Sequence, residues 1–414
     1  MNKITITIIS ATLLYFTAAA QPARKAMFVI VDGISADVIE KIATPALDSI
    51  AAVGGYTRAH VGGGKGDYTQ TPTISAVGYN SLLTGTWVNK HNVWGNDIKR
   101  PNYHYPTIFR LFKSHYPQKK TAIFSSWEDN RTKLIGEGLP ETGGIVLDHH
   151  FDGLEHDTVR YPHDKARDFM HRIDETVVNA AAEHIRKEAP DLSWVYLEYT
   201  DDMGHAYGDS EAFYRAVRLM DAQIGRLWEA IQYRIKNHDE DWVIYITTDH
   251  GRDAKTGKGH GGQSDRERST WIVSNAKGLN TYYRTGNPGI VDIMPTLAGF
   301  LNIAVPRPIL MEVDGIPLTG KVYASDLSAN WENEDTLQVK WNVLEKQGTA
   351  GVWVSFSNHF NKGGEDKYEL LMKVPVENGA ALIPLKKKQA PFVKVVLETP
   401  THFLNRWVGA EEGR

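Results

Sequence analysis

An unbroken apolar run near the start of the chain reads Ala26-Met-Phe-Val-Ile-Val31 and is followed at once by Asp32-Gly33. A run that is apolar on both faces and rich in β-branched residues is typical of a strand buried in a parallel sheet. Two later stretches, Trp194–Tyr199 and Trp242–Thr247, repeat the pattern. Each of the three runs is followed within a few positions by an acidic residue, which makes the ends of these predicted strands candidates for a functional site.

Helical stretches alternate with these predicted strands. Apolar residues recur at helical spacing in residues 36–53, 175–187 and 212–236. An alternation of strand, helix and strand predicts an α/β fold with a doubly wound, mostly parallel sheet that is covered on both faces. Ligands of such sheets bind at the carboxyl ends of the strands, so we expect the acidic residues to converge on one crevice.

The last part of the chain has a different pattern. Apolar and polar residues alternate in 336–341, 351–356 and 392–397, and the segments between them carry Asn, Gly and Lys. Alternation with turn residues between the runs predicts a small all-β sandwich of the fibronectin or immunoglobulin type. We therefore expect a catalytic domain over residues 21–323 and a β-sandwich over residues 327–414.

Composition and charge narrow the functional classes. The chain has 414 residues, of which 46 are Lys or Arg and 50 are Asp or Glu, giving a formal net charge of −4. This balance argues against a protein that binds a nucleic-acid scaffold, because such proteins are usually strongly basic. The chain has no cysteine, which excludes thiol nucleophiles, thiolate metal ligands and disulfides. Any metal site must be built from histidine, carboxylate and hydroxyl groups.

The N-terminus has the pattern of a secretory signal. Lys3 precedes an apolar run over residues 4–16, and Ala18-x-Ala20 resembles a cleavage site for such a signal. This run is too short to span a bilayer, so we interpret residues 1–20 as a signal peptide and expect export to the periplasm or the extracellular space. The alternation Ile-Thr-Ile-Thr-Ile leaves a buried first strand as the alternative. We expect no transmembrane segment in the mature protein.

Acidic and histidine side chains gather after the predicted strands and in one glycine-rich loop. Carboxylate oxygen and imidazole nitrogen suit zinc when thiolates are missing. An isolated Asp-His pair is usually a turn or a core histidine, but their shared position after buried strands favours a metal site. Six such ligands are enough for two metal ions that hold one substrate between them. The candidates are Asp32, Asp201, His205, Asp249, His250 and His260.

A candidate nucleophile lies in the segment from Thr71 to Gly85. Ser75 stands where the sequence predicts the start of a helix that runs to Leu83. Backbone N–H groups and the helix dipole at such a position favour an ionised hydroxyl and a bound phosphate. The structural alternative is that Ser75 only caps the helix.

The chain resembles the alkaline phosphatase superfamily and, within it, the type I phosphodiesterase/nucleotide pyrophosphatase group. The resemblance covers roughly residues 26 to 305, and the order and spacing of its motifs are together highly specific. The motifs are Val31-Asp32-Gly33, Ser75 nine residues before Thr84-Gly85, Asp201-x-x-Gly204-His205, Thr248-Asp249-His250-Gly251, Gly259-His260-Gly261 and Val291-Asp-Ile-Met-Pro-Thr296-Leu.

The resemblance implies two zinc ions, although other divalent metals remain open, and a small-molecule phosphate ester as substrate. It assigns Asp201, His205 and His260 to one ion, and Asp32, Asp249, His250 and the nucleophile Ser75 to the other. It also places Asn96 on a non-bridging phosphoryl oxygen. The implied reaction is cleavage of a phosphodiester or pyrophosphate bond through a phosphoseryl intermediate at Ser75. The oligomeric state is not predicted.

Other activities remain open at this stage. Many diesterases of the group have Thr where this chain has Ser75, and some monoesterases of the superfamily carry a Lys and an Arg that grip an extra phosphate charge. Arg131 and Lys133 are candidates for that pair, and Arg131 is a candidate substrate ligand, although the neighbouring Glu128 and Asp129 would repel a dianion. For Arg131 the structural alternative is a solvated surface charge. An alkaline phosphatase-like monoesterase is therefore the alternative to a diesterase.

Two further classes are weaker alternatives. A sulfatase is disfavoured because the chain has no cysteine to convert to formylglycine, and the Ser75-Ala-Val-Gly78 segment lacks the Pro and Arg of the sulfatase motif. A serine-type sulfatase, in which Ser75 itself is converted, remains a less favoured alternative. A non-catalytic binding protein would have lost at least one metal ligand, whereas all seven positions are filled. The leaving group is not predicted, and the loop from Trp94 to Tyr105 is the segment that we expect to contact it.

Overall fold

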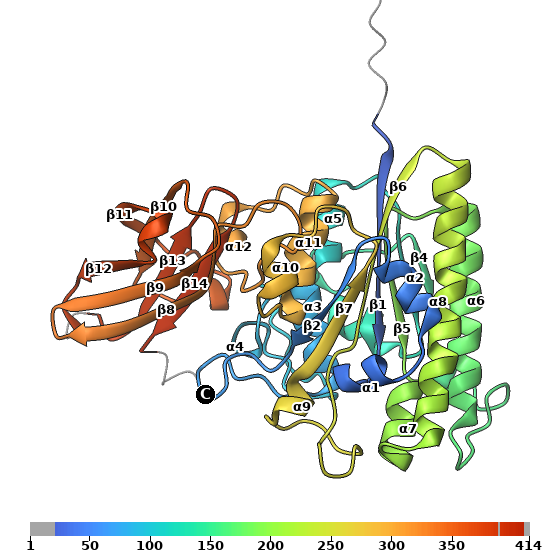
Figure 1. Ribbon diagram of the computed structural model, residues 1–414. Coiled ribbons are helices and arrows are strands. Elements are labelled where there is room, and N and C mark those ends of the chain that lie inside the picture. Colours follow the sequence, from blue (N-terminus) through green and yellow to red (C-terminus); the bar gives the residue numbers. More distant parts are fainter. Residues whose placement is uncertain (1–20, 388–389, 410–414) are drawn as a thin grey trace, which may run out of the picture.

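The computed structural model describes residues 21–387 and 390–409, so the predicted signal peptide, residues 1–20, lies outside the described residues. A central sheet of seven strands has the order β2-β7-β6-β1-β5-β3-β4 (Figure 1). Strand β7 is antiparallel to β6 and β2, and the other pairs are parallel. The predicted doubly wound, mostly parallel sheet is thus confirmed. Its strands are β1 (Ala23–Val31), β2 (Gly55–His60), β3 (Thr121–Ser125), β4 (His149–Phe151), β5 (Leu192–Leu197), β6 (Glu240–Thr247) and β7 (Ser269–Ser274).

The three apolar runs form the three adjacent strands at the centre of the sheet. Strand β1 pairs in parallel with β5 on one side and with β6 on the other. Residues 26–31 of β1 are fully buried, as expected for a strand with helices on both faces. Because the three strands are parallel neighbours, their carboxyl ends lie side by side at one edge of the sheet.

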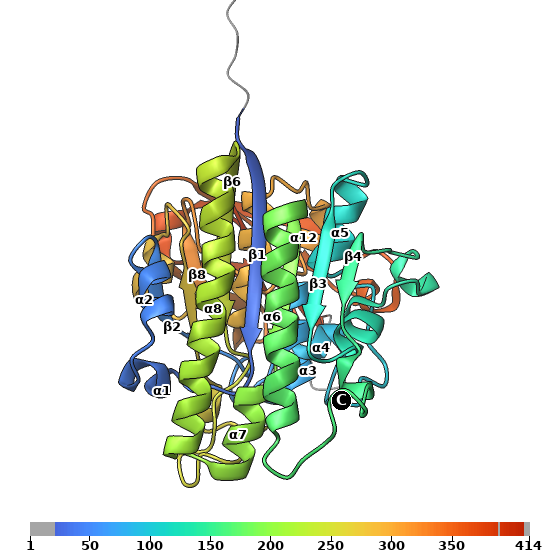
Figure 2. The ribbon, with the colours of Figure 1, turned by 90° about the vertical axis from the view of Figure 1, so that its right-hand side faces the viewer.

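Two long helices, α6 (Asp168–Glu188) and α8 (Glu211–Asn237), cover one face of the sheet (Figure 2). The stretch with helical spacing, residues 36–53, forms two helices, α1 (Ala36–Lys41) and α2 (Pro45–Ala51). Pro45 explains the break, since a residue before proline avoids the helical conformation and proline is favoured in the first turn of a new helix.

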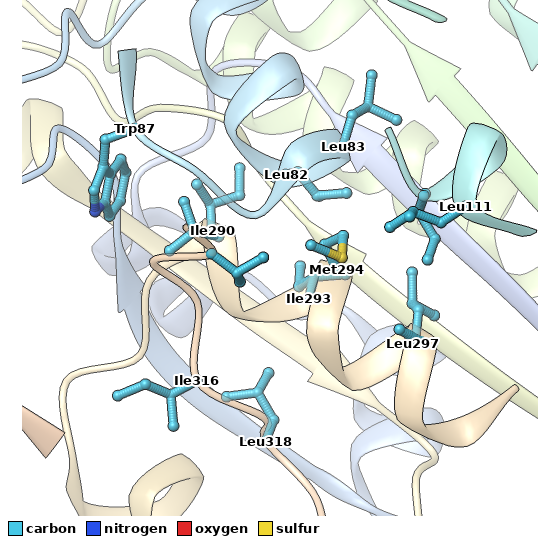
Figure 3. Close-up of a cluster of buried hydrophobic side chains, with 14 of the residues drawn as sticks. Leu82, Leu83, Trp87, Leu111, Ile290, Ile293, Met294, Leu297, Ile316 and Leu318 are labelled. Carbon is cyan, nitrogen blue, oxygen red and sulfur yellow. The ribbon is translucent and has the colours of Figure 1, made fainter. Parts of the chain in front are cut away.

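The opposite face of the sheet is covered by α3 (Ser75–Thr84), α5 (Ile108–His115) and α11 (Ile293–Phe300). Figure 3 shows Leu82 and Leu83 of α3 beside Met294 and Leu297 of α11. All ten residues of α3 are buried, so this helix has no solvent-facing side and its N-terminus is fixed in the interior. The shorter helices are α4 (Val88–His91), α7 (Tyr199–Tyr207), α9 (Asp265–Arg268), α10 (Thr281–Thr285) and α12 (Arg307–Leu310).

The C-terminal region forms two antiparallel sheets, as the alternating sequence predicts. One sheet has the order β11-β10-β13-β14 and the other β12-β9-β8, and apolar side chains from both sheets belong to a shared core. The division into domains at residues 323 and 327 stays a prediction. The strands are β8 (Ala324–Asn333), β9 (Thr336–Val343), β10 (Thr349–Ser355), β11 (Glu369–Pro375), β12 (Ala380–Pro384), β13 (Val393–Glu398) and β14 (Phe403–Val408). Among the residues that the structure describes, no helix has the length and apolar character needed to cross a membrane.

Buried lysines join the C-terminal sheets to the rest of the molecule. Lys90 of α4 is fully buried, and its Nζ donates to Asp314 Oδ1 at 2.5 Å and to Asn405 Oδ1 of β14 at 2.7 Å. Lys394 of β13 is equally buried and donates to Glu312 Oε1 at 2.7 Å. A buried charge of this kind is stable only when it is paired and hydrogen-bonded. These contacts join the sheet that contains β13 and β14 to α4 and to the segment around Glu312 (Figure 1).

A buried histidine in the C-terminal sheets, His402, makes the stability of the protein depend on pH. The ring of His402 is buried, its Nε2 lies 2.9 Å from the carbonyl oxygen of Ala324, and its Nδ1 lies 2.8 Å from Thr399 Oγ1. Since a carbonyl only accepts, Nε2 carries the single proton of a neutral ring. Burial lowers the pKa of His402 to about 4.

We expect the free energy of unfolding to fall as the pH drops below 6.5 towards 4, because the unfolded chain then binds a proton that the folded chain excludes. From pH 7.5 to pH 5 the contribution of His402 is a loss of about 2 kcal/mol. Urea unfolding at both pH values would measure it, and His402→Gln should lose correspondingly less between them. Equal losses in the variant and the wild type would contradict the assignment.

Candidate active site

Five of the predicted ligands follow the three central strands. Asp32 comes directly after β1, and Asp249 and His250 follow β6. The third strand, β5, ends at Leu197 rather than at the expected Tyr199, and Asp201 and His205 both lie on α7. Their spacing of four residues places these two side chains on one face of that helix. His260, the sixth predicted ligand besides Ser75, lies in the glycine-rich loop after β6.

Asp32, Asp249 and His250 form the first cluster that could hold a metal ion. His250 Nε2 lies 3.3 Å from Asp32 Oδ1 and 3.3 Å from Asp249 Oδ2. All three side chains are buried, and neither of these two carboxylate oxygens has a hydrogen-bond partner among the described residues. Buried carboxylate oxygens normally have a partner, so the geometry fits a cation between these groups.

Asp201, His260 and His250 form the second such cluster. Asp201 Oδ1 lies 4.0 Å from the Nε2 atoms of both His250 and His260. The predicted ligand His205 adjoins this cluster, with its Nε2 3.2 Å from Asp201 Oδ2 and 3.1 Å from His260 Nε2. The rings of His250 and His260 stack with centroids 3.7 Å apart. The two clusters are thus adjacent and share His250.

Hydrogen bonds outside the clusters orient both buried imidazoles. His250 Nδ1 lies 3.0 Å from the carbonyl oxygen of Gly251, and His260 Nδ1 lies 2.9 Å from the carbonyl oxygen of Thr73. A carbonyl accepts only, so in each neutral ring the proton is on Nδ1 and the Nε2 lone pair faces the cluster. Orientation of this kind by an outer hydrogen bond is common among metal-binding histidines.

Three carboxylates, those of Asp32, Asp201 and Asp249, lie close together around His250. Burial, reinforced by Asp32, raises the pKa of Asp249 well above its usual range. Burial alone would lower the pKa of His250, but Asp249, Asp32 and Asp201 outweigh it and raise that pKa to about 9. Burial and the neighbouring His250 lower the pKa of His260 to about 4. A bound cation would relieve the repulsion between the carboxylates, as bound metal ions do elsewhere.

Arg252 is a functional residue that sequence reasoning missed. Its guanidinium is buried beneath the site, where it donates to the Asp201 carboxylate and, at 2.8 Å, to the carbonyl oxygen of Gly33. A side chain at Gly204 would overlap the guanidinium, because its Cβ would lie 2.1 Å from Arg252 Cζ. Gly33 has a positive φ of 69°, and a side chain there would overlap the Asp201 carboxylate and the Arg252 guanidinium. Gly33 and Gly204, which both belong to the sequence motifs, therefore leave space for the Arg252 side chain, which holds Asp201.

Two tyrosines hold the other oxygen of Asp32. The hydroxyls of Tyr79, on α3, and Tyr196, on β5, both donate to Asp32 Oδ2, the latter at 2.7 Å. Both rings are buried. With Oδ2 occupied in this way, the carboxylate is fixed so that Oδ1 faces His250. The sequence gives little indication that these tyrosines contact a metal ligand, because a tyrosine within an apolar segment is usually a core residue.

We expect the double variant Tyr79→Phe/Tyr196→Phe to bind metal 10 to 100 times more weakly, the usual effect of removing outer hydrogen bonds from a ligand. Tyr161→Phe is the matched control, because it removes a buried tyrosine hydroxyl that bonds only to Thr176 Oγ1 among the described residues. Titration with a competing chelator would measure both affinities. Equal affinities in the two variants would show that the tyrosines do not act on Asp32.

Ser75 is the first residue of α3, and Ile74 is the N-cap, without a side-chain capping bond. The alternative that Ser75 only caps the helix is therefore wrong. Ser75 Oγ lies 3.4 Å from His250 Nε2 and so borders the first cluster. Asn96 Oδ1 accepts a hydrogen bond from Ala76 N at 3.0 Å, which places this amide beside Ser75. The structure thus brings Ser75, Asn96 and the six predicted Asp and His residues together at one end of α3.

Arg131 lies elsewhere, on a short π-helix, η1 (Asn130–Ile135). All three nitrogens of its guanidinium donate to carboxylates: Nε to Asp152 at 2.7 Å, Nη1 to Glu137 at 2.9 Å, and Nη2 to Asp152 at 2.9 Å and Glu128 at 3.2 Å. Lys133 pairs with Asp129 at 2.7 Å. Because its donors already serve acidic side chains, we do not include Arg131 in the proposed site. Its side chain is only 14% exposed, so the alternative that it is a solvated surface charge is wrong.

The chain matches one protein family and several known proteins. The family described as type I phosphodiesterase / nucleotide pyrophosphatase matches residues 26–258. A 2,3-bisphosphoglycerate-independent phosphoglycerate mutase of Helicobacter hepaticus is 26% identical over 158 residues, which are 38% of this chain and 30% of the mutase. The chain spans less than a third of the length of the curated relatives that it matches.

Solved structures share the fold at low sequence identity. A 2-O GAG sulfatase aligns with a TM-score of 0.52 and 13% identity over 90% of this chain and 86% of the sulfatase. Murine ectonucleotide pyrophosphatase / phosphodiesterase 5 aligns with a TM-score of 0.50 and 13% identity over 68% of this chain and 96% of the murine chain. At this identity the similarity shows a common fold.

Proposed function

Since the chain belongs to the type I phosphodiesterase / nucleotide pyrophosphatase family of the alkaline phosphatase superfamily, we propose that it cleaves phosphodiester or pyrophosphate bonds through a phosphoseryl intermediate at Ser75. As a member of this family it is a metal-dependent phosphoric ester hydrolase. The observation that supports Ser75 as the nucleophile is the position of its Oγ atom. This atom lies 3.4 Å from His250 Nε2, at the border of the carboxylate–imidazole clusters.

We propose that two divalent cations, zinc by preference, bind the two clusters. The donor set of carboxylates and neutral imidazoles suits zinc, and the unpartnered oxygens Asp32 Oδ1 and Asp249 Oδ2 fit a missing positive charge. Asp32, Asp249, His250 and Ser75 would hold one ion, and Asp201, His205 and His260 the other. When bound, such a pair of ions polarises the phosphoryl group and favours ionisation of the serine hydroxyl.

The residues of the chain position the nucleophile and the phosphate. Ser75 Oγ attacks phosphorus, the new O–P bond forms as the bond to the leaving oxygen breaks, and a water molecule then hydrolyses the phosphoserine and releases the phosphate product. The N-terminus of the buried helix α3 favours the negative phosphoryl group. The Asn96 amide, which is held by Ala76 N, is placed to bind a non-bridging oxygen.

A diester or pyrophosphate substrate is favoured over a monoester. A monoester dianion needs an additional cationic partner, and the predicted one, Arg131, already serves Asp152, Glu137 and Glu128. The similarity to a sulfatase supports the fold alone, and the serine-type sulfatase remains the weaker proposal. A non-catalytic binding protein is disfavoured because all the candidate ligands lie together. We also propose export, on the basis of the N-terminal signal pattern.

The decisive experiment compares bis-p-nitrophenyl phosphate with p-nitrophenyl phosphate as substrates for the zinc-loaded protein. We expect faster hydrolysis of the diester, loss of activity after treatment with a chelator, and recovery when zinc is restored. A clear preference for the monoester would overturn the diesterase proposal in favour of a monoesterase. Activity that resists complete removal of metal, as measured by elemental analysis, would overturn the role of the clusters.

A further inference from the structure

A large cleft lies between the catalytic part of the chain and the C-terminal sheets. Its volume is about 1410 Å³, and its lining combines Pro72 and Gly261 with Asn358, Asn361 and Trp407 from the C-terminal region. Small-molecule pockets usually measure about 300–1,000 Å³. The cleft is therefore large enough for a ligand of several linked rings rather than one.

The floor of the cleft leads to the candidate active site. Gly261 follows His260 directly, and its N–H donates to Thr73 Oγ1 at 2.9 Å. Thr73 in turn accepts the Nδ1 proton of His260 on its carbonyl oxygen and lies two residues before Ser75. The segment that positions the nucleophile and the loop that carries His260 thus form one end of the cleft. A substrate phosphate at Ser75 would leave its organic group near this end.

Side-chain contacts join the two sides of the cleft. Tyr68 stacks on Trp407 of β14 with ring centroids 5.5 Å apart, and its hydroxyl accepts a hydrogen bond from Trp407 N at 2.8 Å. Asn102 Nδ2 donates to Asn361 Oδ1 at 2.7 Å. These contacts join the two sides of the cleft, so its lining is preformed for a ligand.

The lining has one exposed aromatic side chain and two asparagines with polar atoms that have no hydrogen-bond partner among the described residues. Trp94 is 50% exposed, and its Nε1 donates to Asn92 Oδ1 at 2.9 Å, which fixes the edge of the indole while a large part of the side chain faces solvent. Both polar atoms of the Asn89 amide, and Asn358 Oδ1 opposite, are buried without a hydrogen-bond partner among the described residues. An asparagine amide offers two donors and an acceptor.

The geometry points to an oligosaccharide as the organic group that occupies the cleft, so that the substrate is a phosphorylated glycan. Neighbouring hydroxyls of a sugar match the paired donor and acceptor of an amide, and the C–H face of a pyranose ring stacks on an indole. The acidic residue in the lining, Asp67, is already paired with Arg406 at 2.6 Å. The lining also holds one exposed arginine, Arg100. Because most of the other lining side chains are amides and aromatic rings, a hydroxyl-rich ligand fits the lining better than a charged peptide. This inference deepens the proposed function and rests on it.

The first test measures selectivity between substrates. The probes are an α-mannotriose carrying a methyl phosphodiester on one 6-hydroxyl, the nucleotide diester thymidine 5′-monophosphate p-nitrophenyl ester, and the small diester bis-p-nitrophenyl phosphate. We expect Trp94→Ala and Asn358→Ala to lower kcat/KM for the glycan diester at least tenfold relative to kcat/KM for the small diester. Tyr233→Ala, which truncates a partly exposed aromatic residue on α8, is the control and should leave this ratio unchanged.

The second test does not depend on catalysis and uses saturation-transfer NMR with neutral mannotriose, cellotriose, chitotriose and maltotriose. We expect saturation transfer to at least one of them, and its loss in Trp94→Ala but not in Tyr233→Ala. If no diester is hydrolysed but this binding is seen, the proposed function fails and the glycan cleft stands. An unchanged ratio in the Trp94 and Asn358 variants, a loss confined to the nucleotide diester, or no saturation transfer from any trisaccharide would overturn the inference.

Discussion

Replacing Ser75 by alanine is expected to reduce kcat for bis-p-nitrophenyl phosphate by at least about 10³-fold, because the variant has no hydroxyl to form the phosphoseryl intermediate. Ser75 Oγ borders the first cluster at 3.4 Å from His250 Nε2, but the two carboxylates and the imidazole of that cluster stay in place. Metal content should therefore remain close to that of the wild type. Steady-state kinetics and elemental analysis of the same preparation would measure both.

Ser75→Thr is the matched variant, since it keeps a hydroxyl on the first residue of α3. We expect it to retain substantially more activity than Ser75→Ala, provided that the extra methyl group is accommodated at this buried position. Trapping of a phosphorylated wild-type enzyme by rapid acid quench, with the label mapped to Ser75 by mass spectrometry, would support the assignment directly. Wild-type turnover in Ser75→Ala would rule out this nucleophile.

The second large effect is expected from Asp249→Asn. This change keeps the shape of the side chain but removes a negative charge beside His250 Nε2, 3.3 Å from Asp249 Oδ2. We expect the variant to lose about one of two metal equivalents and, with it, at least about 10³-fold in kcat/KM, because two-ion catalysis requires both sites to be filled. Elemental analysis after dialysis and kinetics at saturating zinc would separate affinity from activity.

Asp265→Asn is the control for this experiment, since its carboxylate is almost completely exposed and pairs only loosely with Lys65 at 3.5 Å. It should keep both the metal content and the activity of the wild type. A full complement of metal in Asp249→Asn would show that Asp249 is not a ligand. Full activity with one equivalent of metal would show that a single ion suffices.

The central sheet could be predicted from the sequence because its signal is local. The buried runs that became β1, β5 and β6 are apolar on both faces, and their order along the chain implies parallel neighbours. Differences from the expected pattern also have local causes. Pro45 divides the helical stretch 36–53 into two helices, and the strand expected to reach Tyr199 ends at Leu197 because α7 begins at Tyr199.

The rest of the site could not be read from the sequence because it depends on contacts between distant segments. Arg252 reaches Asp201 only because Gly33 and Gly204, on two other elements, leave space for its guanidinium. Likewise the cleft brings Trp94 and Asn358 into one lining although they are far apart in the chain. The periodicity or motif of a single segment does not predict contacts between segments that are far apart in the sequence.

The buried lysines Lys90 and Lys394 link the α/β part of the chain to the C-terminal sheets, which bears on how the two parts evolve. Lys90 pairs with Asp314 in its own half of the chain and also donates to Asn405 in the other half. Lys394 pairs with Asp366 in its own half and also donates to Glu312 in the other. A gene fusion or deletion that separated the strands after Ala324 from the α/β sheet would take one hydrogen-bond partner from each lysine and expose both buried ion pairs to water. We therefore expect the α/β part and the C-terminal sheets to be inherited together, so that recombination between related genes exchanges both parts at once.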